Sequence, residues 1–478
     1  MEKETKKDNR FYTKFLTFVK KNKWLIIIFI IAVLLRLVLL SVNVHNAPDF
    51  ANAIKGDDGY FEYSRNIADG NGFTYKEGDV YLPTTLRPPL YPYFLATLIS
   101  IYDSYPFVIF IQIIIGSLIP VLAMLVARKY ILRDSIVITI GFLLAIEPYS
   151  MLMSVIFYTE TLFTFLFLIF IIFLFSYIKK QSWRNLIITS VFLALAVLVK
   201  PTVQYLPILF PLLVMWQTKR YFSKEVILKS LVFVGIFIIL ISPWLYRNYR
   251  VFGKIDMSAQ QAFNLYVYFA PSVRAIEFKT GFAKELNAFT TERGVDVNNI
   301  TLANSSYYTK EALTEIVRYP FSVIKILCVS VITFFTHDGM LTVFGYADIR
   351  PSVAITSPVW KILLDNPREF TLKLWEISRS PFIMIPIIRI IWILNLIAML
   401  IGIFKLLKDK KFNVYYTIIL LFILYFAGTT TINGLGVNAR FRLPILIGIF
   451  SFSVVGFLYI FEYLKKKIVS IKLSKFFK

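Results

Sequence analysis

The residues best suited to chemistry lie in a polar stretch, residues 56–92, that interrupts a very apolar chain. It contains two adjacent carboxylates, Asp57 and Asp58, in GDDGYFEYSRNIADG. Such a pair can supply a general base and a partner that orients an acceptor or a metal ion. The structural alternative is a helix cap, because aspartate near a helix N-terminus accepts hydrogen bonds from the first turn and complements the helix dipole. The residue types alone leave both interpretations open.

Arg87, in LRPPLYPYF, is the second candidate in this stretch. A guanidinium close to a membrane surface suits bidentate binding of a phosphate, although an interfacial arginine can also simply extend to lipid headgroups. Prolines at positions 88, 89 and 92 stiffen the chain and would fix Arg87 relative to the aspartates. The prolines therefore favour a functional arginine.

Further charged residues lie within or beside apolar segments, where a charge needs a partner. Glu160 opens the apolar run that follows FYT, and Arg36 lies inside another run, LLRLVLL, where it either extends to the membrane surface or meets a lipid-linked anion. The basic residues at the ends of apolar segments are Lys200, Arg247, Arg440 and Arg442. A phosphate or pyrophosphate on a lipid carrier would supply their anion, and ion pairs with nearby carboxylates are the alternative.

The sequence contains few candidate residues for other kinds of chemistry. The two histidines, His45 and His337, stand far apart in the sequence, so a histidine-based metal site is not expected. The single cysteine, Cys328, allows neither an intramolecular disulfide nor a cysteine metal cluster. Neither of the two common glycine-rich nucleotide-binding motifs occurs, which argues against a nucleotide-binding enzyme. Activated sugars carried on lipids remain as candidate substrates.

Membrane helices must position these residues. Of the 478 residues, 57% are hydrophobic and 17% are charged, so too few polar side chains remain to cover a soluble globule. The apolar runs have the length of a bilayer-crossing helix, about twenty residues. The net charge of +23 comes from lysines and arginines beside these runs. That is the positive-inside pattern, with attraction to membrane lipids, and we expect no nucleic-acid partner.

We therefore predict an all-α polytopic membrane protein with roughly ten transmembrane helices and two large extracytoplasmic loops. The basic N-terminal segment reads as a cytoplasmic tail before a retained anchor, and the basic C-terminal tail is also placed in the cytoplasm. The expected spans are residues 24–42, 105–127, 136–147, 162–178, 186–199, 203–216, 226–245, 382–404, 414–428 and 443–460.

Three parts of the chain follow from this topology. They are an N-terminal membrane module (1–245) with a catalytic loop (43–104), a second extracytoplasmic region (246–380), and C-terminal helices with a basic tail (381–478). Residues 321–335 are apolar enough to span the bilayer, but two cytoplasmic termini favour an interfacial helix there. A partner span hidden within residues 341–364 is the alternative.

Several motifs, taken in order, resemble one known family. They are GDDGYFEYSRNIADGNGF, RPPLYPYFLA, EPYSMLMSVIFYTETLFTFL, LAVLVKPT, SPWLYRNYRVFGK and NARFRLPIL. The chain resembles the bacterial and archaeal relatives of the dolichyl-phosphate-mannose protein mannosyltransferases, of glycosyltransferase family 39. These belong to the glycosyltransferase C superfamily, together with the lipid A aminoarabinose transferases. The resemblance implies a fold of the glycosyltransferase C type.

The resemblance also implies roles for individual residues. The leading acid of the first loop, thought to act at the reaction centre, falls on Asp57, whereas Asp58 stands where many relatives have glutamate. The basic residue that meets the carrier phosphate maps to Arg87, and the acidic residue that opens the fourth span maps to Glu160. The protein mannosyltransferases imply no cofactor. A divalent metal, as bound by other relatives, is possible but not required.

The leading hypothesis is an inverting transfer of a hexose or pentose from a polyprenyl-phosphate donor to an extracytoplasmic acceptor, which is a protein, lipid or glycan. Asp57 would accept the acceptor's proton, and Arg87, with Arg247 or Arg440, would stabilise the phosphate that leaves. One alternative is a transporter or flippase of lipid-linked sugars, for which Arg36 and Arg389 are the intramembrane candidates. A glycan polymerase or ligase is the other alternative.

Overall fold

The computed structural model describes residues 2–131, 133–218, 223–295, 299–349 and 378–476, with the isolated positions 368, 372 and 375. The regular secondary structure of these residues is helical except for one antiparallel hairpin of β1 (Thr74–Glu77) and β2 (Val80–Pro83). In this hairpin Thr74 lies opposite Pro83. Most of the suggested hidden span, from residue 350 to 364, lies outside the described residues.

Helices occur in both halves of the described chain. Those of the first half are α1 (Glu2–Asn46), α2 (Phe50–Ile54), α3 (Tyr60–Ala68), α4 (Leu90–Ile101), α5 (Tyr105–Ala127), α6 (Asp134–Ile146), α7 (Pro148–Val155), α8 (Glu160–Lys180), α9 (Trp183–Val199), η1 (Pro201–Val203), α10 (Leu206–Thr218) and α11 (Lys224–Phe252). Those of the second half are α12 (Gln260–Phe263), η2 (Asn264–Phe269), α13 (Ala270–Glu277), α14 (Phe282–Thr291), α15 (Ser305–Arg318), α16 (Pro320–Thr336), α17 (Met340–Tyr346), η4 (Pro381–Ile383), α20 (Met384–Lys408), α21 (Val414–Thr430), η5 (Thr431–Gly436), η6 (Ala439–Ile445) and α22 (Leu446–Phe476).

Seven helical stretches in the described residues are long and apolar enough to cross a bilayer, or up to nine if two bent helix pairs each count as one span. The bent pairs are α6 with α7, at 53°, and α15 with α16, at 103°. The predicted all-α polytopic membrane fold is confirmed. The predicted number of spans, roughly ten, is higher than the number in the structure. The prediction includes residues 186–199 and 203–216 as spans, whereas these residues form the shorter helices α9 and α10.

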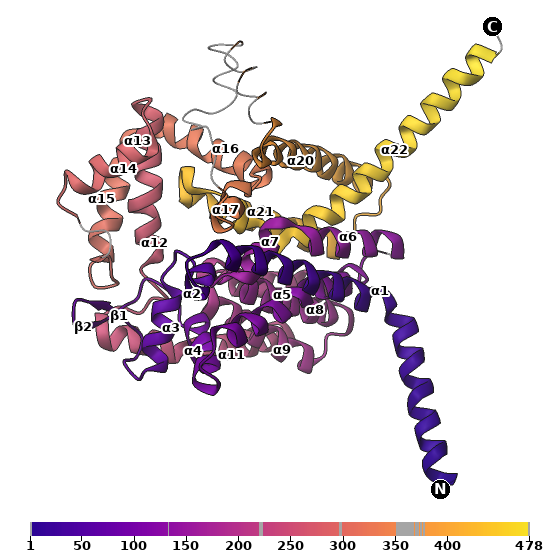
Figure 1. Ribbon diagram of the computed structural model, residues 1–478, viewed down its shortest axis with the longest axis horizontal. Helices are drawn as coiled ribbons and strands as arrows, with labels where there is room; N and C mark the ends of the chain where they lie inside the picture. Colours follow the sequence, from indigo (N-terminus) through magenta and orange to yellow (C-terminus); the bar gives the residue numbers. More distant parts are fainter. Residues whose placement is uncertain are drawn as a thin grey trace.

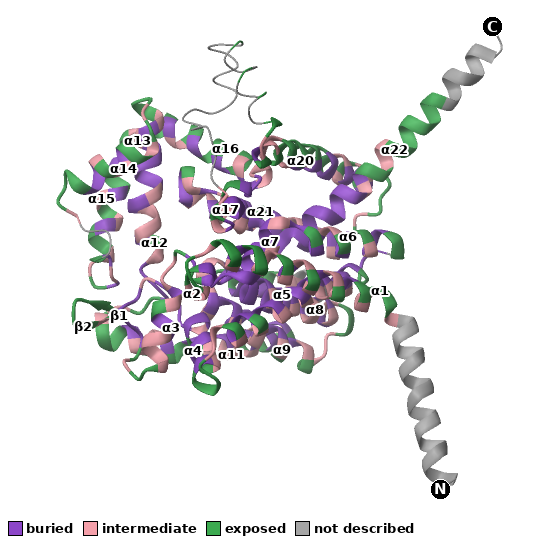
Figure 2. Cartoon of the chain, viewed as in Figure 1, coloured by how far each residue is buried: buried purple, intermediate pink, exposed green. Residues whose placement is uncertain are grey.

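The bundle has two distinct ends. Both termini project from one end, whereas the β hairpin and α13 to α15 lie at the other (Figure 1). The helices differ in how deeply they are buried. In the most apolar windows of α8 and the α22 stretch 67% of residues are buried, against 28% in those of α11 and the α20 stretch. Figure 2 shows the buried residues gathered along the inner helices, so the exposed apolar faces of α11 and α20 are the ones that would meet lipid.

Helices α20 and α22 approach each other closely through two glycines. A Cβ atom on Gly402 would collide with the backbone carbonyl of Phe452, and one on Gly456 would collide with that of Ala398. Small residues allow this contact because association of helices inside a membrane depends on van der Waals packing rather than on a hydrophobic driving force. The contact between α20 and α22 also positions η6, because η6 leads directly into α22.

A small helical subdomain, α12 to α15, is held together by buried ion pairs. The guanidinium of Arg274 contacts Glu285 at 2.9 Å and Glu315 at 2.8 Å, so it joins α13, α14 and α15. Glu315 has a side chain only 2% exposed, and it also contacts Arg293 and Arg318. Residues 321–335, expected as an interfacial helix, belong to α16, which contacts η5, α20 and α21.

We expect Gly402→Ala to destabilise the protein by about 1–3 kcal/mol, because the added methyl group overpacks the contact between α20 and α22. Gly235→Ala in α11 is the matched control, since a Cβ at Gly235 meets no atom within 4 Å, and it should be neutral or slightly stabilising. Thermal unfolding of the purified protein in detergent measures both. Equal effects at the two positions would contradict the close-approach interpretation.

Candidate active site

The two adjacent aspartates lie in a tight turn between α2 and α3. Flanking glycines make the turn possible, because Gly56 and Gly59 have φ of +63° and +78°, in the left-handed region. A Cβ on Gly56 would also approach the carbonyl oxygen of Phe157 to 2.7 Å. The Phe157 amide donates to the Ile54 carbonyl at 2.8 Å, so the turn is pressed against the start of α8.

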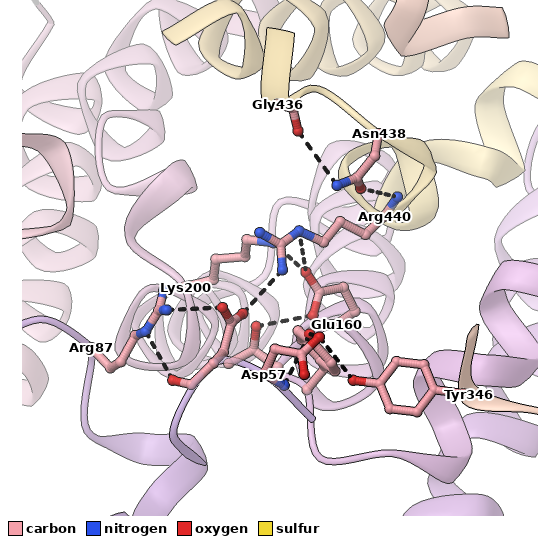
Figure 3. Close-up of polar contacts among 11 residues, drawn as sticks. Asp57, Arg87, Glu160, Lys200, Tyr346, Gly436, Asn438 and Arg440 are labelled. Carbon is pink, nitrogen blue, oxygen red and sulfur yellow. Dashed lines mark hydrogen bonds and ion pairs between the residues drawn. The ribbon is translucent and has the colours of Figure 1, made fainter. Parts of the chain in front are cut away.

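Asp58 joins two arginines that come from distant parts of the chain. Its Oδ1 accepts from Arg87 Nη2 at 2.8 Å, and its Oδ2 accepts from Arg440 Nη1 at 3.0 Å. Arg87 also donates through Nε to the Asp58 carbonyl at 3.2 Å. Arg440 is the second residue of η6, and Asn438 caps this turn by accepting from the Arg440 amide. Figure 3 shows the side chains of Arg87, from the first loop, and of Arg440, from the segment before α22, on either side of this contact.

Glu160 is the second buried acid of the site and holds a third cation. Its side chain is 2% exposed, and its Oε1 accepts from Lys200 Nζ at 2.8 Å, with Arg440 Nε at 4.0 Å. Lys200 directly precedes Pro201, which disfavours a helical conformation for the residue before it. Helix α9 therefore ends at Val199, and the extended Lys200 points its ammonium group at the start of α8.

The arginines decide the ionisation of Asp58. Burial raises the pKa of this carboxyl, but the charges of Arg87, Arg440 and Lys200 outweigh burial and hold the pKa below its usual value. Burial likewise lowers the pKa of Arg87, and the Asp58 charge more than compensates, so its pKa is raised. The pair is therefore ionised at neutral pH, and Asp58 is a poor proton acceptor.

The three cations line a single cavity of about 320 Å³. Its walls also carry amides and hydroxyls from several segments, among them Gln260, Asn264, Thr429 and Asn433, and aromatic rings, among them Tyr60, Tyr205, Phe263, Tyr268 and Phe441. A cavity of this composition suits a ligand that has an anionic group and a polyhydroxyl part.

The cations keep unused hydrogen-bond donors. Arg440 Nε is buried and has no hydrogen-bond partner among the described residues. Lys200 has three N–H groups, of which its bond to Glu160 uses one. A buried donor without a partner is costly in free energy, so these groups favour a ligand that brings additional acceptor oxygens.

Asp57 faces a different direction from Asp58. Its amide donates to Tyr158 Oη at 3.1 Å, and its Oδ2 accepts from the hydroxyls of Tyr158 and Tyr346, each at 3.3 Å. Asp57 is exposed and lies in a second, more open hollow of about 450 Å³, together with Lys55, Glu62 and Tyr346. The two adjacent aspartates therefore line two different hollows.

The two tyrosines were not among the residues predicted from the sequence. Burial raises the pKa of Tyr158 and of Tyr346, so both hydroxyls stay protonated and act as donors. The sequence offers little to single them out among 28 tyrosines. Only the position of Tyr158 beside Glu160 in FYTETLF would have drawn attention to it.

Two of the predicted cations do not line the cavity. Arg247 donates to the carbonyls of Thr84 at 2.9 Å and Phe73 at 3.3 Å, so it holds the loop that carries Arg87. Arg36 is fully buried, and its Nε donates to Ser154 Oγ at 3.1 Å. Both arginines therefore support the surrounding structure.

The remaining charged candidates also lie elsewhere. Arg442 is fully buried against Trp392 and donates to the Phe334 carbonyl at 3.1 Å. Arg389 donates to the buried Asp338 carboxylate. The intramembrane arginines considered for a transport path are thus engaged with other groups of the protein.

The carboxylates of the cavity do not fit a divalent metal ion. Asp58 and Glu160 both accept from cations, which would repel a metal. In the described part of the chain, no group of three or more histidine, cysteine, aspartate or glutamate side chains is arranged to hold a metal. We therefore derive no metal-dependent step.

Comparison with known proteins shows a family resemblance over part of the chain. Residues 86–246 match the family described as dolichyl-phosphate-mannose-protein mannosyltransferase. The predicted resemblance to the dolichyl-phosphate-mannose protein mannosyltransferases is confirmed over these residues. The matched range includes Arg87, Glu160 and Lys200, whereas Asp57, Asp58 and Arg440 lie outside it. No curated protein matches the chain.

Two solved structures illustrate the likeness. An oligosaccharyltransferase of Archaeoglobus fulgidus, solved with zinc and sulfate, is 14% identical, with a TM-score of 0.46 over 94% of this chain and 51% of that one. This chain thus spans about half the length of that protein. ArnT of Cupriavidus metallidurans, solved with undecaprenyl phosphate, is 12% identical, with a TM-score of 0.39 over 91% of this chain and 78% of that one.

The ion pairs of Asp58 predict a pH-dependent stability. Because the folded pKa of Asp58 is depressed, its contribution is complete above the unfolded pKa of about 4 and is lost as the pH falls through the folded pKa. Asp58→Asn should cost about 3 kcal/mol at neutral pH. The difference in Tm between the native protein and this variant should be constant above about pH 5 and shrink in more acidic buffer.

Asp103→Asn is the control for this measurement. Asp103 pairs with Arg65 at the surface, where its side chain is 59% exposed, so its loss should have little effect at any pH. A difference for Asp58→Asn that did not change with pH would contradict the assignment of an ionised, paired carboxylate.

Proposed function

We propose, with the family match over residues 86–246 as the premise, that the protein is a membrane glycosyltransferase. It would transfer a sugar from a polyprenyl-phosphate donor to an acceptor hydroxyl or amine, with inversion at the anomeric carbon. The observation that supports this best is the convergence of Arg87, Lys200 and Arg440 on one cavity.

The cations suit the phosphate of the donor. Arg87 and Arg440 are already oriented by Asp58, and Lys200 by Glu160, so their positions are fixed before the donor binds. Negative charge grows on the phosphate as its bond to the sugar breaks, and preorganised cations stabilise such charge most strongly where water is excluded. In this proposal the two buried acids hold the cations and take no proton.

Asp57 then serves as the general base. Asp57 lines the open hollow, where an acceptor can enter, while the hydroxyls of Tyr158 and Tyr346 hold its Oδ2. The acceptor oxygen or nitrogen attacks the anomeric carbon from the side opposite the phosphate, and its proton passes to Asp57. The bond between the anomeric carbon and the phosphate oxygen breaks, and its electron pair leaves with the polyprenyl phosphate. No metal ion takes part.

In this proposal the reaction occurs at the outer membrane surface. A lipid-linked donor requires a site at a membrane surface, and the cavity is lined by the turn before α3 and by α12, which lie at the end of the bundle away from both termini (Figure 1). With the basic termini in the cytoplasm, the site faces the extracytoplasmic side of the cell membrane. The acceptor is therefore an extracytoplasmic protein, lipid or glycan.

A flippase or transporter is less well supported. Arg36 is enclosed by α1, α6 and α7, and it donates to the carbonyls of Ala32 and Ala145. Arg389 is paired with Asp338. Neither arginine belongs to the cavity, so the charges do not describe a path through the bundle. A polymerase or ligase would share the cations but has no particular need for the exposed Asp57.

Asp57→Asn should lower kcat by about 10²–10⁴, because the amide cannot accept the acceptor's proton. Asp58→Asn should instead raise KM for the donor, since it frees the two arginines from their common partner. The measurement is transfer of a radiolabelled sugar from its polyprenyl phosphate by the reconstituted protein. Glu77→Gln on the exposed hairpin is the control for expression and turnover, and near-normal turnover by Asp57→Asn would disprove the base assignment.

Arg440→Gln and Lys200→Gln should each lower kcat/KM by about 10²–10³, because each removes a cation aimed at the departing phosphate. Lys76→Gln, which removes an exposed cation from the same end of the protein, should leave the rate unchanged. The same transfer assay measures all three variants. An unchanged rate for both cavity variants would show that the phosphate binds elsewhere.

Cysteine labelling tests the side of the membrane. In a Cys328→Ser background, Glu77→Cys in β1 should react with an impermeant maleimide in intact cells. Lys410→Cys, between α20 and α21, should react only after lysis. The opposite pattern would place the cavity on the cytosolic side and rule out the proposed reaction.

A further inference from the structure

A groove of about 810 Å³ lies beside the cavity, between the segment before α12 and one face of α15. The two hollows share three wall residues, Asp256, Ser258 and Gln261. Asp57 is not among the residues of the groove. The groove is therefore adjacent to the candidate donor site without being part of the machinery proposed for the transfer reaction.

The polar end of the groove is positively charged. Lys254 and Lys310 line it, and Lys254 Nζ donates to Ser305 Oγ at 3.2 Å and to Ser306 Oγ at 2.6 Å. Neither lysine is paired with a carboxylate among the residues that the structure describes. The one acidic residue of the wall, Asp256, accepts from the Met257 amide at 2.6 Å. Two lysines beside serine hydroxyls suit a phosphate group.

The polarity changes along α15. Ser305, Ser306, Thr309 and Lys310 line the groove near the start of the helix, whereas Leu313, Thr314 and Val317 line it further along, where two of the three are apolar. Val317 is 76% exposed. The groove thus leads from a basic, hydroxyl-rich end to an apolar end on the same helix.

Exposed apolar residues also lie beyond the end of the groove. Helix α16 starts two residues after α15, across a bend of 103°. Near its start Phe321 is 78% exposed and Ile324 is 58% exposed. Because α16 contacts α20 and α21, it carries this apolar surface from the end of the bundle towards the membrane helices.

We propose that the groove binds the phosphate headgroup of an anionic membrane lipid, with one acyl chain along Val317, Phe321 and Ile324. This lipid is distinct from the sugar donor, whose phosphate is assigned to the neighbouring cavity. Basic pockets beside membrane helices bind anionic headgroups in this way, and an apolar helix face at the interface accommodates the acyl chain. The proposal does not require the transfer reaction.

The polarity gradient favours a lipid over a glycan or a peptide. A glycan would leave Leu313 and Val317 exposed, and it would find no aromatic ring in the lining of the groove. An extended peptide would need a sheet edge or a row of apolar pockets. A lipid with a phosphate headgroup matches both ends of the groove and the apolar surface that follows.

Photocrosslinking tests the proposal on the full-length protein in nanodiscs. A photoreactive phosphatidylglycerol should crosslink to residues 302–324, as mapped by peptide mass spectrometry, and phosphatidylcholine with the same chains should do so much less. Lys254→Gln combined with Lys310→Gln should reduce the crosslink about thirtyfold, because each of the two lysines near an anionic headgroup contributes about 1 kcal/mol. Lys284→Gln, an exposed charge on α14, should leave it unchanged.

Further crosslinking experiments distinguish the lipid from other ligands of the groove. Val317→Asn should weaken the phosphatidylglycerol crosslink, while glycerol phosphate, which has no chain, should compete poorly. Equal crosslinking of both lipids, or no loss in the lysine variant, would overturn the proposal. So would protection of the groove by an oligosaccharide or peptide but not by the lipid. Size-exclusion profiles and Tm of each variant ensure that a lost crosslink is not a lost fold.

Discussion

The site depends on the pairing of buried opposite charges. Asp58 and Glu160 hold Arg87, Lys200 and Arg440, and these five residues come from separate segments of the chain. A buried charge costs several kcal/mol unless it is paired, so the cluster is stable only when all its segments are in place. The same requirement fixes the first loop, the ends of α8 and α9, and η6 against one another. A phosphate would therefore meet cations that need little rearrangement.

The membrane helices could largely be predicted, because each long apolar run indicates a span by its own length and composition. The span expected at residues 105–127 is the observed α5, Tyr105–Ala127. The site was predictable only as separate candidates. Arg247 and Arg440 look alike in sequence, each a cation beside an apolar helix, and only their contacts distinguish a loop support from a cavity wall. Distances between segments hundreds of residues apart have no local pattern that reveals them.

The adjacent aspartates show the same limit on a smaller scale. In sequence Asp57 and Asp58 differ only in order, and either one suits a base. In the structure the flanking glycines force a turn that directs one side chain to the open hollow and the other to the arginines. Tyr346, which is far from Asp57 in the sequence, donates its hydroxyl to the Asp57 carboxylate. No spacing in the first loop indicates that contact.

Helix α16 joins the groove beside α15 to the cation cluster. Ser330 on α16 donates to the Gly434 carbonyl, and Arg442 in η6 donates to the Phe334 carbonyl of α16, so this helix is bonded to the segment that carries Arg440. A shift of α16 would therefore reach the backbone next to Arg440 through these two hydrogen bonds.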